Sequence, residues 1–140
     1  MSDSPRSLHP SWIAFGWFIA AAITSLAVIA LEVLGIVGDN PADEALWVGL
    51  ALFLGFLVSG YFVGARVARA PVIYGMAMGL FSIVAWLALN LLLGEATGMT
   101  SWGSLPLGTT IFLLLLQCIA AVIGVWLGIR SLTRGSAPSR

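Results

Sequence analysis

Long runs of apolar residues, uncharged except for Glu32 in the first, make up most of the chain and are separated by short polar or glycine-rich segments. The runs predict four membrane-spanning helices, at about residues 12–37, 45–65, 71–93 and 106–129. Each run is long enough to cross a bilayer, because a helix needs about 20 apolar residues to span the hydrocarbon core. We therefore expect an all-α fold: a four-transmembrane-helix antiparallel bundle, with residues 1–140 forming a single integral membrane domain.

The segment between the first two runs has the residues typical of a helix N-terminus. In Asn40-Pro41-Ala42-Asp43-Glu44, Asn40 is a suitable cap and proline is tolerated at the first helical position. The two acids that follow lie at the positive end of the helix dipole. The second helix is therefore predicted to begin here, whereas Gly38 and Asp39 stop the first run.

Composition supports the membrane assignment and removes several kinds of chemistry. Of the 140 residues, 60% are hydrophobic and 9% are charged, whereas about a quarter of an average soluble domain is charged. Cys118 is the only cysteine and His9 the only histidine, so neither a disulfide nor a Cys/His metal cluster can form within the chain. We expect no cofactor, no metal, no enzymatic activity and no nucleic-acid partner.

The arginines fix the expected orientation. All six basic residues are arginine, and they fall in the N-terminal segment, the second connection and the C-terminal tail: Arg6, Arg66, Arg69, Arg130, Arg134 and Arg140. The first and third connections carry only acids, so the positive-inside rule predicts that both termini are cytoplasmic. We expect Arg66, Arg69, Arg130 and Arg134 to set topology and contact lipid phosphates, the alternative being a contact with another protein.

A cleavable signal peptide over residues 1–30 is the alternative for the first run. Arg6 supplies a charged start and Val28-Ile29-Ala30 a small-residue cleavage site. The apolar stretch is about 25 residues long, however, whereas signal-peptide cores have about 7 to 15. The length favours a retained helix.

Small residues recur at a spacing of four, which lets helices approach closely in lipid. The glycine pairs are Gly60/Gly64, Gly75/Gly79, Gly94/Gly98 and Gly124/Gly128, and the first run has Gly16/Ala20. All except Gly94/Gly98 lie in the cytoplasmic halves of the runs, whereas the outer halves are bulky. This predicts a bundle that converges at its cytoplasmic end, with the second and third spans as its tightest corner around Gly64 and Gly75. The alternative is that these glycines face lipid.

Ionisable and polar groups at membrane depth are the first place to look for function. Glu32 lies about 30 Å along the helix from Trp12, near the outer boundary. Asn90 lies one turn from the outer end of the third span, where a hydrogen bond to Glu32 would satisfy both groups. The remaining candidates are weaker polar groups in mid-span, for which bonding between helices is the expected role: Gln117, Ser82, Ser25 and Thr24.

The run Ser59-Gly60-Tyr61-Phe62-Val63-Gly64-Ala65-Arg66, followed by Pro71 and Gly75/Gly79, resembles the central hairpin of uncharacterised small four-span bacterial membrane proteins. The resemblance covers about 20 residues and implies a multi-pass protein of the bacterial inner membrane, with no active residues. Small multidrug transporters are also similar in span number, but the acid in their first span is central, whereas Glu32 is at the outer end.

The shortage of chemical groups favours a non-enzymatic accessory or structural subunit. We expect it to associate through its Gly/Ala-lined helix faces, with itself or with a larger membrane complex, in contact with membrane lipids. The alternative is a small oligomeric transporter or channel with an outward-facing polar site near Glu32. A membrane enzyme would depend on the outer acids, which are already explained by topology and by the helix start.

Overall fold

A computed structural model describes residues 10–36, 40–67, 70–97 and 107–135. Side chains are described throughout these ranges except at 41, 42, 86, 89–91, 93–97, 107 and 135. The described chain is all-helical, as predicted. Its elements are α1 (Pro10–Val33), α2 (Pro41–Val67), α3 (Pro71–Thr97) and α4 (Leu107–Gly135).

Three of the four helices are long and apolar enough to cross a membrane. The qualifying stretches are Pro10–Val33, Asp43–Val67 and Gly108–Arg134. In α3 the apolar stretch that qualifies among the described residues is shorter, Pro71–Ala85. The apolar composition and helix lengths are typical of a membrane protein.

The predicted start of the second helix is confirmed. Helix α2 begins at Pro41, with Asp43 and Glu44 in its first turn. The backbone N–H groups of Asp43 and Glu44 donate to the carbonyl of Asn40, at 3.0 and 3.1 Å. Proline loses nothing at this position, because its missing N–H would have had no partner within the helix.

Helix α1 ends earlier than the apolar run predicted, at Val33 instead of residue 37. Gly35 has a φ of 66°, in the left-handed region that glycine adopts without strain. The N–H of Ile36 donates to the carbonyl of Leu31, and that of Gly35 to the carbonyl of Glu32, both at 3.0 Å. This hydrogen-bond pattern is a Schellman motif, which ends a helix by satisfying its last carbonyls whatever the polarity of the residues that follow.

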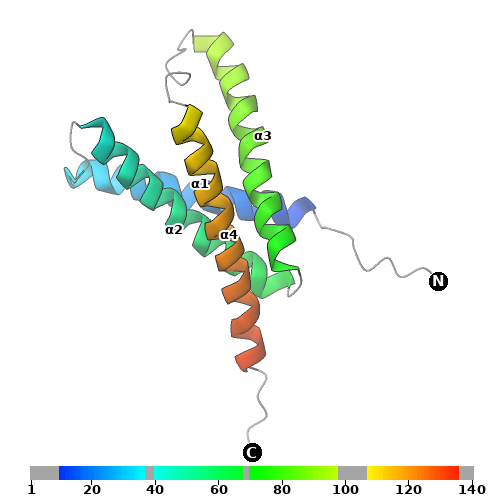
Figure 1. Ribbon diagram of the computed structural model, residues 1–140. Coiled ribbons are helices and arrows are strands. Elements are labelled where there is room, and N and C mark those ends of the chain that lie inside the picture. The colour runs from blue at the N-terminus through cyan, green and yellow to red at the C-terminus, as the bar shows by residue number, and fades with distance from the viewer. Residues whose placement is uncertain (1–9, 37–39, 68–69, 98–106, 136–140) are drawn as a thin grey trace, which may run out of the picture.

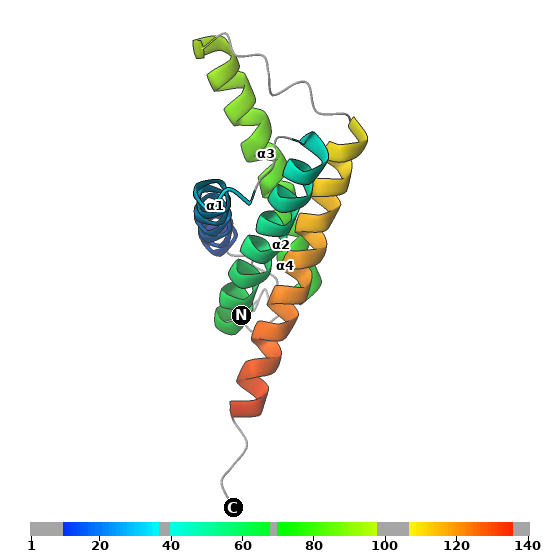
Figure 2. The same cartoon turned by 90° about the vertical axis from the view of Figure 1, so that its left-hand side faces the viewer.

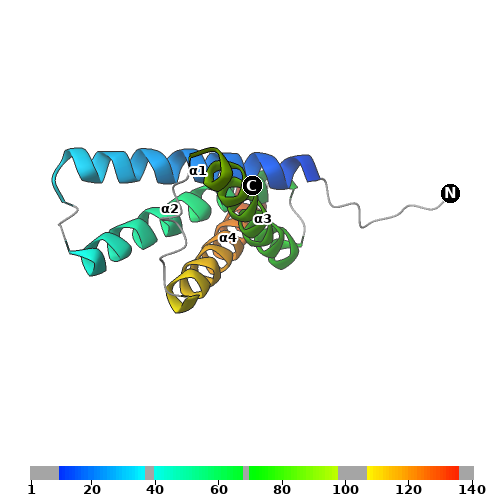
Figure 3. The ribbon, with the colours of Figure 1, turned by 90° about the horizontal axis from the view of Figure 1, so that it is seen from above.

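Helices α2 and α4 lie side by side and run in the same direction, and α3 runs in the opposite direction beside α4 (Figures 1 and 2). Helix α1 does not align with this group. It packs on α2 and α3 and runs at a steep angle to α3 and α4, so that in Figure 3 α1 extends across the view while α3 and α4 are foreshortened. The arrangement is more open than a regular bundle of aligned helices.

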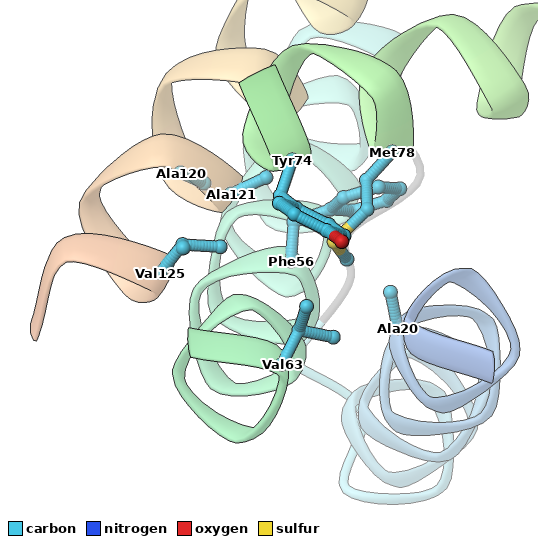
Figure 4. Close-up of a cluster of buried hydrophobic side chains, with 8 residues drawn as sticks. All are labelled: Ala20, Phe56, Val63, Tyr74, Met78, Ala120, Ala121 and Val125. Carbon is cyan, nitrogen blue, oxygen red and sulfur yellow. The ribbon is translucent and has the colours of Figure 1, made fainter. Parts of the chain in front are cut away.

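All four helices contribute to one apolar core (Figure 4). Its buried members come from α1 (Ala20), α2 (Phe56, Val63), α3 (Tyr74, Met78) and α4 (Ala120, Ala121, Val125). Trp17 of α1 adds an edge-to-face contact with Phe81 of α3, with ring centroids 5.5 Å apart. In lipid, hiding apolar surface gains little, so van der Waals packing of this kind is what holds the helices together.

The prediction that the second and third spans form the tightest corner is wrong. Although α2 and α3 are joined by a short connection, they make few contacts with one another. Gly64 of α2 lies against Val125 of α4, and Gly75 of α3 lies against Val122 of α4. The two glycines therefore share α4 as their partner, and α4 has extensive contacts with both α2 and α3.

Candidate functional site

Among the described residues, α2 and α4 make the most extensive helix contact, and two glycine pairs face each other there. A methyl group added at Gly60 would lie 2.5 Å from the carbonyl oxygen of Ala121. Added at Gly64 it would meet the backbone of Val125, and added at Gly124 it would meet the carbonyl of Leu57. Because backbone atoms cannot rotate away as side chains do, these positions accept only glycine without moving a helix.

The fourth glycine of this contact, Gly128, lies beside Ala65 and Tyr61 of α2. A methyl group there would lie 2.7 Å from the Ala65 nitrogen and would also meet the carbonyl of Tyr61. The four residues Gly60, Gly64, Gly124 and Gly128 are all buried. We call them the α2–α4 glycine seam.

Helix α3 packs on another side of α4 through the pair Gly75 and Gly79. A methyl group at Gly75 would lie 2.7 Å from the Cα of Val122, again at backbone. At Gly79 it would meet the Sγ of Cys118, the end of a side chain that can rotate. The pair Gly94/Gly98 lies outside the residues whose side chains are described.

Helix α1 crosses the group at Gly16 and Ala20, both buried. The Ser59 hydroxyl of α2 donates a hydrogen bond to the carbonyl of Gly16. A methyl group at Gly16 would lie 2.7 Å from Val63 Cγ2 and 3.0 Å from Met78 Cε. The crossing is therefore held by shape and by a buried polar bond together.

Two residues at this crossing were not singled out from the sequence. A methyl group at Gly55 would lie 2.8 Å from the carbonyl of Ala20, and Ser59 is completely buried. Together they form a small pair at spacing four, which a search for two glycines passes over but a search for any two small residues would find. Thr24 adds a longer hydrogen bond across the same contact, from its hydroxyl to the carbonyl of Ala51, at 3.4 Å.

Within the described chain, Gln117 of α4 has a buried polar side chain with an unpartnered oxygen. It is 7% exposed, and its Oε1 has no hydrogen-bond partner among the described residues. Its neighbours along the same face of α4, Ala120 and Ala121, are core residues. Of the other mid-span groups, Ser82 is partly buried and Ser25 is exposed.

Glu32 lies in the last turn of α1 and is exposed. Its carboxylate has no partner among the described side chains. The side chain of Asn90 lies outside those that the structure describes, so the predicted bond between the two residues stays a prediction. No residue of α1 after Ala20 is buried, and this half of the helix presents apolar side chains such as Leu26 and Ile29 to the surroundings.

The described arginines, Arg66, Arg130 and Arg134, are all exposed. Arg69 lies outside the described residues. The guanidinium carbon of Arg130 lies over the Trp126 ring, 5.0 Å from its centroid. At this end of α4, the Ser131 hydroxyl donates to the Gly128 carbonyl at 2.7 Å and the Thr133 hydroxyl to the Arg130 carbonyl at 2.9 Å.

The described chain contains no group of three or more His, Cys, Asp or Glu residues that could hold a metal ion. No protein-family model, curated protein or solved structure matches the sequence. The site residues therefore have to be interpreted from their own geometry, and the likeness to small four-span bacterial proteins stays a prediction.

Proposed function

We propose that this chain is a non-enzymatic, multi-pass protein of the bacterial inner membrane that serves as an accessory or structural subunit. It crosses the bilayer four times with both termini in the cytoplasm, and it associates with a second copy or with a larger membrane complex. One observation carries the proposal: beyond Thr24, which bonds to α2, no residue of α1 is buried and most of its side chains are exposed.

The length of α3 supports four crossings. At 27 residues it is about 40 Å long, and its sequence stays uncharged from Pro71 to Leu93. It lies along α4 and runs the opposite way, as a third crossing between α2 and α4 would (Figure 1). The apolar surface that the molecule leaves exposed on every helix suits contact with lipid.

The faces predicted to bind a partner are used within the chain itself. Gly16 and Ala20 pack on α2 and α3, and the glycine pairs of α2, α3 and α4 pack on one another's helices. Association must therefore use another surface. The second half of α1 is suited to it, because Ser25 and Glu32 are exposed there among apolar side chains, and polar groups in membrane helices usually face protein.

A matched pair of positions tests this assignment. Ile29 of α1 is 55% exposed and Ile119 of α4 is 54% exposed, so a photoreactive amino acid at either position samples its surroundings equally. After irradiation of native membranes, we expect position 29 to give one discrete protein adduct and position 119 to label lipid. An adduct near twice 14.7 kDa indicates a second copy, and a different single mass indicates another subunit.

The outcome that contradicts the proposal is lipid labelling alone at both positions. Equal protein adducts at both positions also contradict it, because they would mean that the contact is not confined to α1. Each variant is first checked for unchanged thermal stability in detergent, so that a misfolded protein is not mistaken for an unpartnered one.

A further inference from the structure

The last turns of α4 carry a stripe of three exposed side chains at a spacing of four residues: Trp126, Arg130 and Arg134. Residues four apart in a helix lie on one face with their Cβ atoms about 6 Å apart. Arg130 is held against Trp126, its guanidinium carbon 5.0 Å from the ring centroid. A guanidinium over an aromatic face keeps its N–H donors at its edge, free for an acceptor.

The packing of α4 on α2 gives the depth of this stripe. Gly128 lies against Ala65, so Arg130 is near the level of Arg66, at the end of α2. Arg134 lies one turn further out, where α4 extends beyond α2 and α3 (Figures 1 and 2). Trp126 lies one turn further in, as interfacial tryptophans do at the boundary between acyl chains and headgroups.

Charge at this end of the described chain is of one sign. The acids whose side chains are described are Glu32, Asp43 and Glu44. Glu32 is near the end of α1. Asp43 and Glu44 are in the first turn of α2, at the end of that helix opposite to Arg66. Neither Arg130 nor Arg134 forms an ion pair within the described residues. Two guanidinium groups on one face therefore lie at headgroup level with no counter-charge from a described side chain.

We infer that the Trp126–Arg130–Arg134 stripe is a binding site for the headgroup of an anionic phospholipid. One phosphate lies between the two guanidinium groups, which donate charge-assisted hydrogen bonds to its oxygens. The acyl chains of the lipid lie along α4 beside the Trp126 ring. This inference rests on the membrane placement proposed above, but it does not depend on which side of the membrane the stripe faces.

Native mass spectrometry of the whole protein in detergent micelles tests the site, with phosphatidylglycerol and phosphatidylcholine as the added lipids. We expect the wild type to bind phosphatidylglycerol at least about fivefold more tightly, the effect of about one basic residue near an anionic lipid. The variant R130Q/R134Q should lose most of that preference. The variant R130K/R134K keeps the charge and should retain at least half of it.

The matched control removes the same charge from the same end of the molecule but from another segment. Arg66 and Arg69 are also expected to contact lipid phosphates, but not as a pair on one helix face, so R66Q/R69Q should reduce the preference for phosphatidylglycerol clearly less than R130Q/R134Q does. An equal loss in R66Q/R69Q would overturn the site, because the preference would then follow overall charge. Unchanged preference in R130Q/R134Q would also overturn it.

Arginines near a helix C-terminus also stabilise the helix through its dipole. A purely local role of this kind predicts that R130Q/R134Q lowers the thermal stability in lipid-free micelles and leaves lipid preference unchanged. That result counts against the lipid site. Because both ends of the protein are accessible in a micelle, failure of the lipid site leaves the four-crossing proposal standing.

Discussion

At the scale of single residues, we predict that the glycines of the α2–α4 glycine seam are the described residues that tolerate substitution least. A methyl group at Gly124 would lie 3.0 Å from the Tyr61 nitrogen and would also meet the carbonyl of Leu57. Because both are backbone atoms, Gly124→Ala forces the helices apart. We expect it to lower the free energy of unfolding by about 2 kcal/mol, the usual cost of overpacking, measured by thermal or denaturant unfolding in detergent.

Two other glycine substitutions serve as controls for that loss. At Gly108 an added methyl group has nothing within 4 Å, so Gly108→Ala should be neutral or stabilising by up to about 1 kcal/mol. At Gly79 it would meet the Cys118 side chain, so Gly79→Ala should cost less than Gly124→Ala, and Cys118→Ala should rescue it. A cost at Gly108 as large as at Gly124 would show that backbone contact is not the cause.

At the scale of elements, the start of α3 contains a residue in a conformation that does not suit it. Ala70 is exposed and has a φ of 44°, in the left-handed region. Its carbonyl accepts the first hydrogen bond of α3, from the N–H of Tyr74 at 3.2 Å. Glycine adopts this φ without the clash that a Cβ brings, so Ala70→Gly should stabilise the protein by about 1 kcal/mol.

The measurement for Ala70→Gly is a midpoint of thermal unfolding above that of the wild type, at unchanged helix content by circular dichroism. Gly108→Ala, which involves no positive φ, provides the comparison for a change between the same two residue types. A lower midpoint for Ala70→Gly would mean that the flexibility added to the connection outweighs the relief of strain.

Helix boundaries were predictable from the sequence where local chemistry decides them. The start of α2 follows from Asn40 and Pro41, whose effects are confined to one turn. The end of α1 was missed because Gly35 ends the helix inside an apolar run, and the run was extended by hydrophobicity alone. Gly35 itself was the available signal, since glycine is the usual residue just after a helix.

Helix partners were not predictable in the same way. The glycine pairs that contain Gly64 and Gly75 indicate that each helix has a face of small residues. They do not indicate which helix packs on that face. Proximity along the chain suggested that α2 and α3 pair, whereas both pack on α4. The arrangement of the helices depends on how the small-residue faces of all of them can be packed at the same time. One connection in the chain does not determine it.

At the scale of the whole molecule, α2, α3 and α4 are close together near the α2–α3 connection and spread apart toward their other ends (Figures 1 and 2). This agrees with the glycine pairs at one end and bulky residues at the other. What the sequence did not indicate is the steep crossing of α1. That crossing depends on contacts with two helices: Ser59 of α2 bonds to Gly16 and Gly55 lies against Ala20, and Trp17 packs on Phe81 of α3.

The number of crossings and their direction can be measured together. In a C118A background, which has no cysteine, Ile36→Cys and Ala70→Cys place single exposed thiols in the two connections that flank α2. On intact cells, we expect a membrane-impermeant maleimide to label position 36, and to label position 70 only after permeabilisation. The reason is the positive-inside rule: Arg66 and Arg69 lie in or next to the second connection, whereas only acids lie in or next to the first.

A reporter enzyme that is active only after export, fused after Arg140, separates four crossings from three. If α3 crosses, the chain returns to the cytoplasm at the end of α4 and the fusion is inactive. If α3 stays on the cytoplasmic side, position 70 remains protected but the end of α4 emerges outside and the fusion is active. Four crossings keep every arginine on the cytoplasmic side, whereas three would export Arg130, Arg134 and Arg140 against the positive-inside rule. We therefore expect an inactive fusion together with a protected position 70.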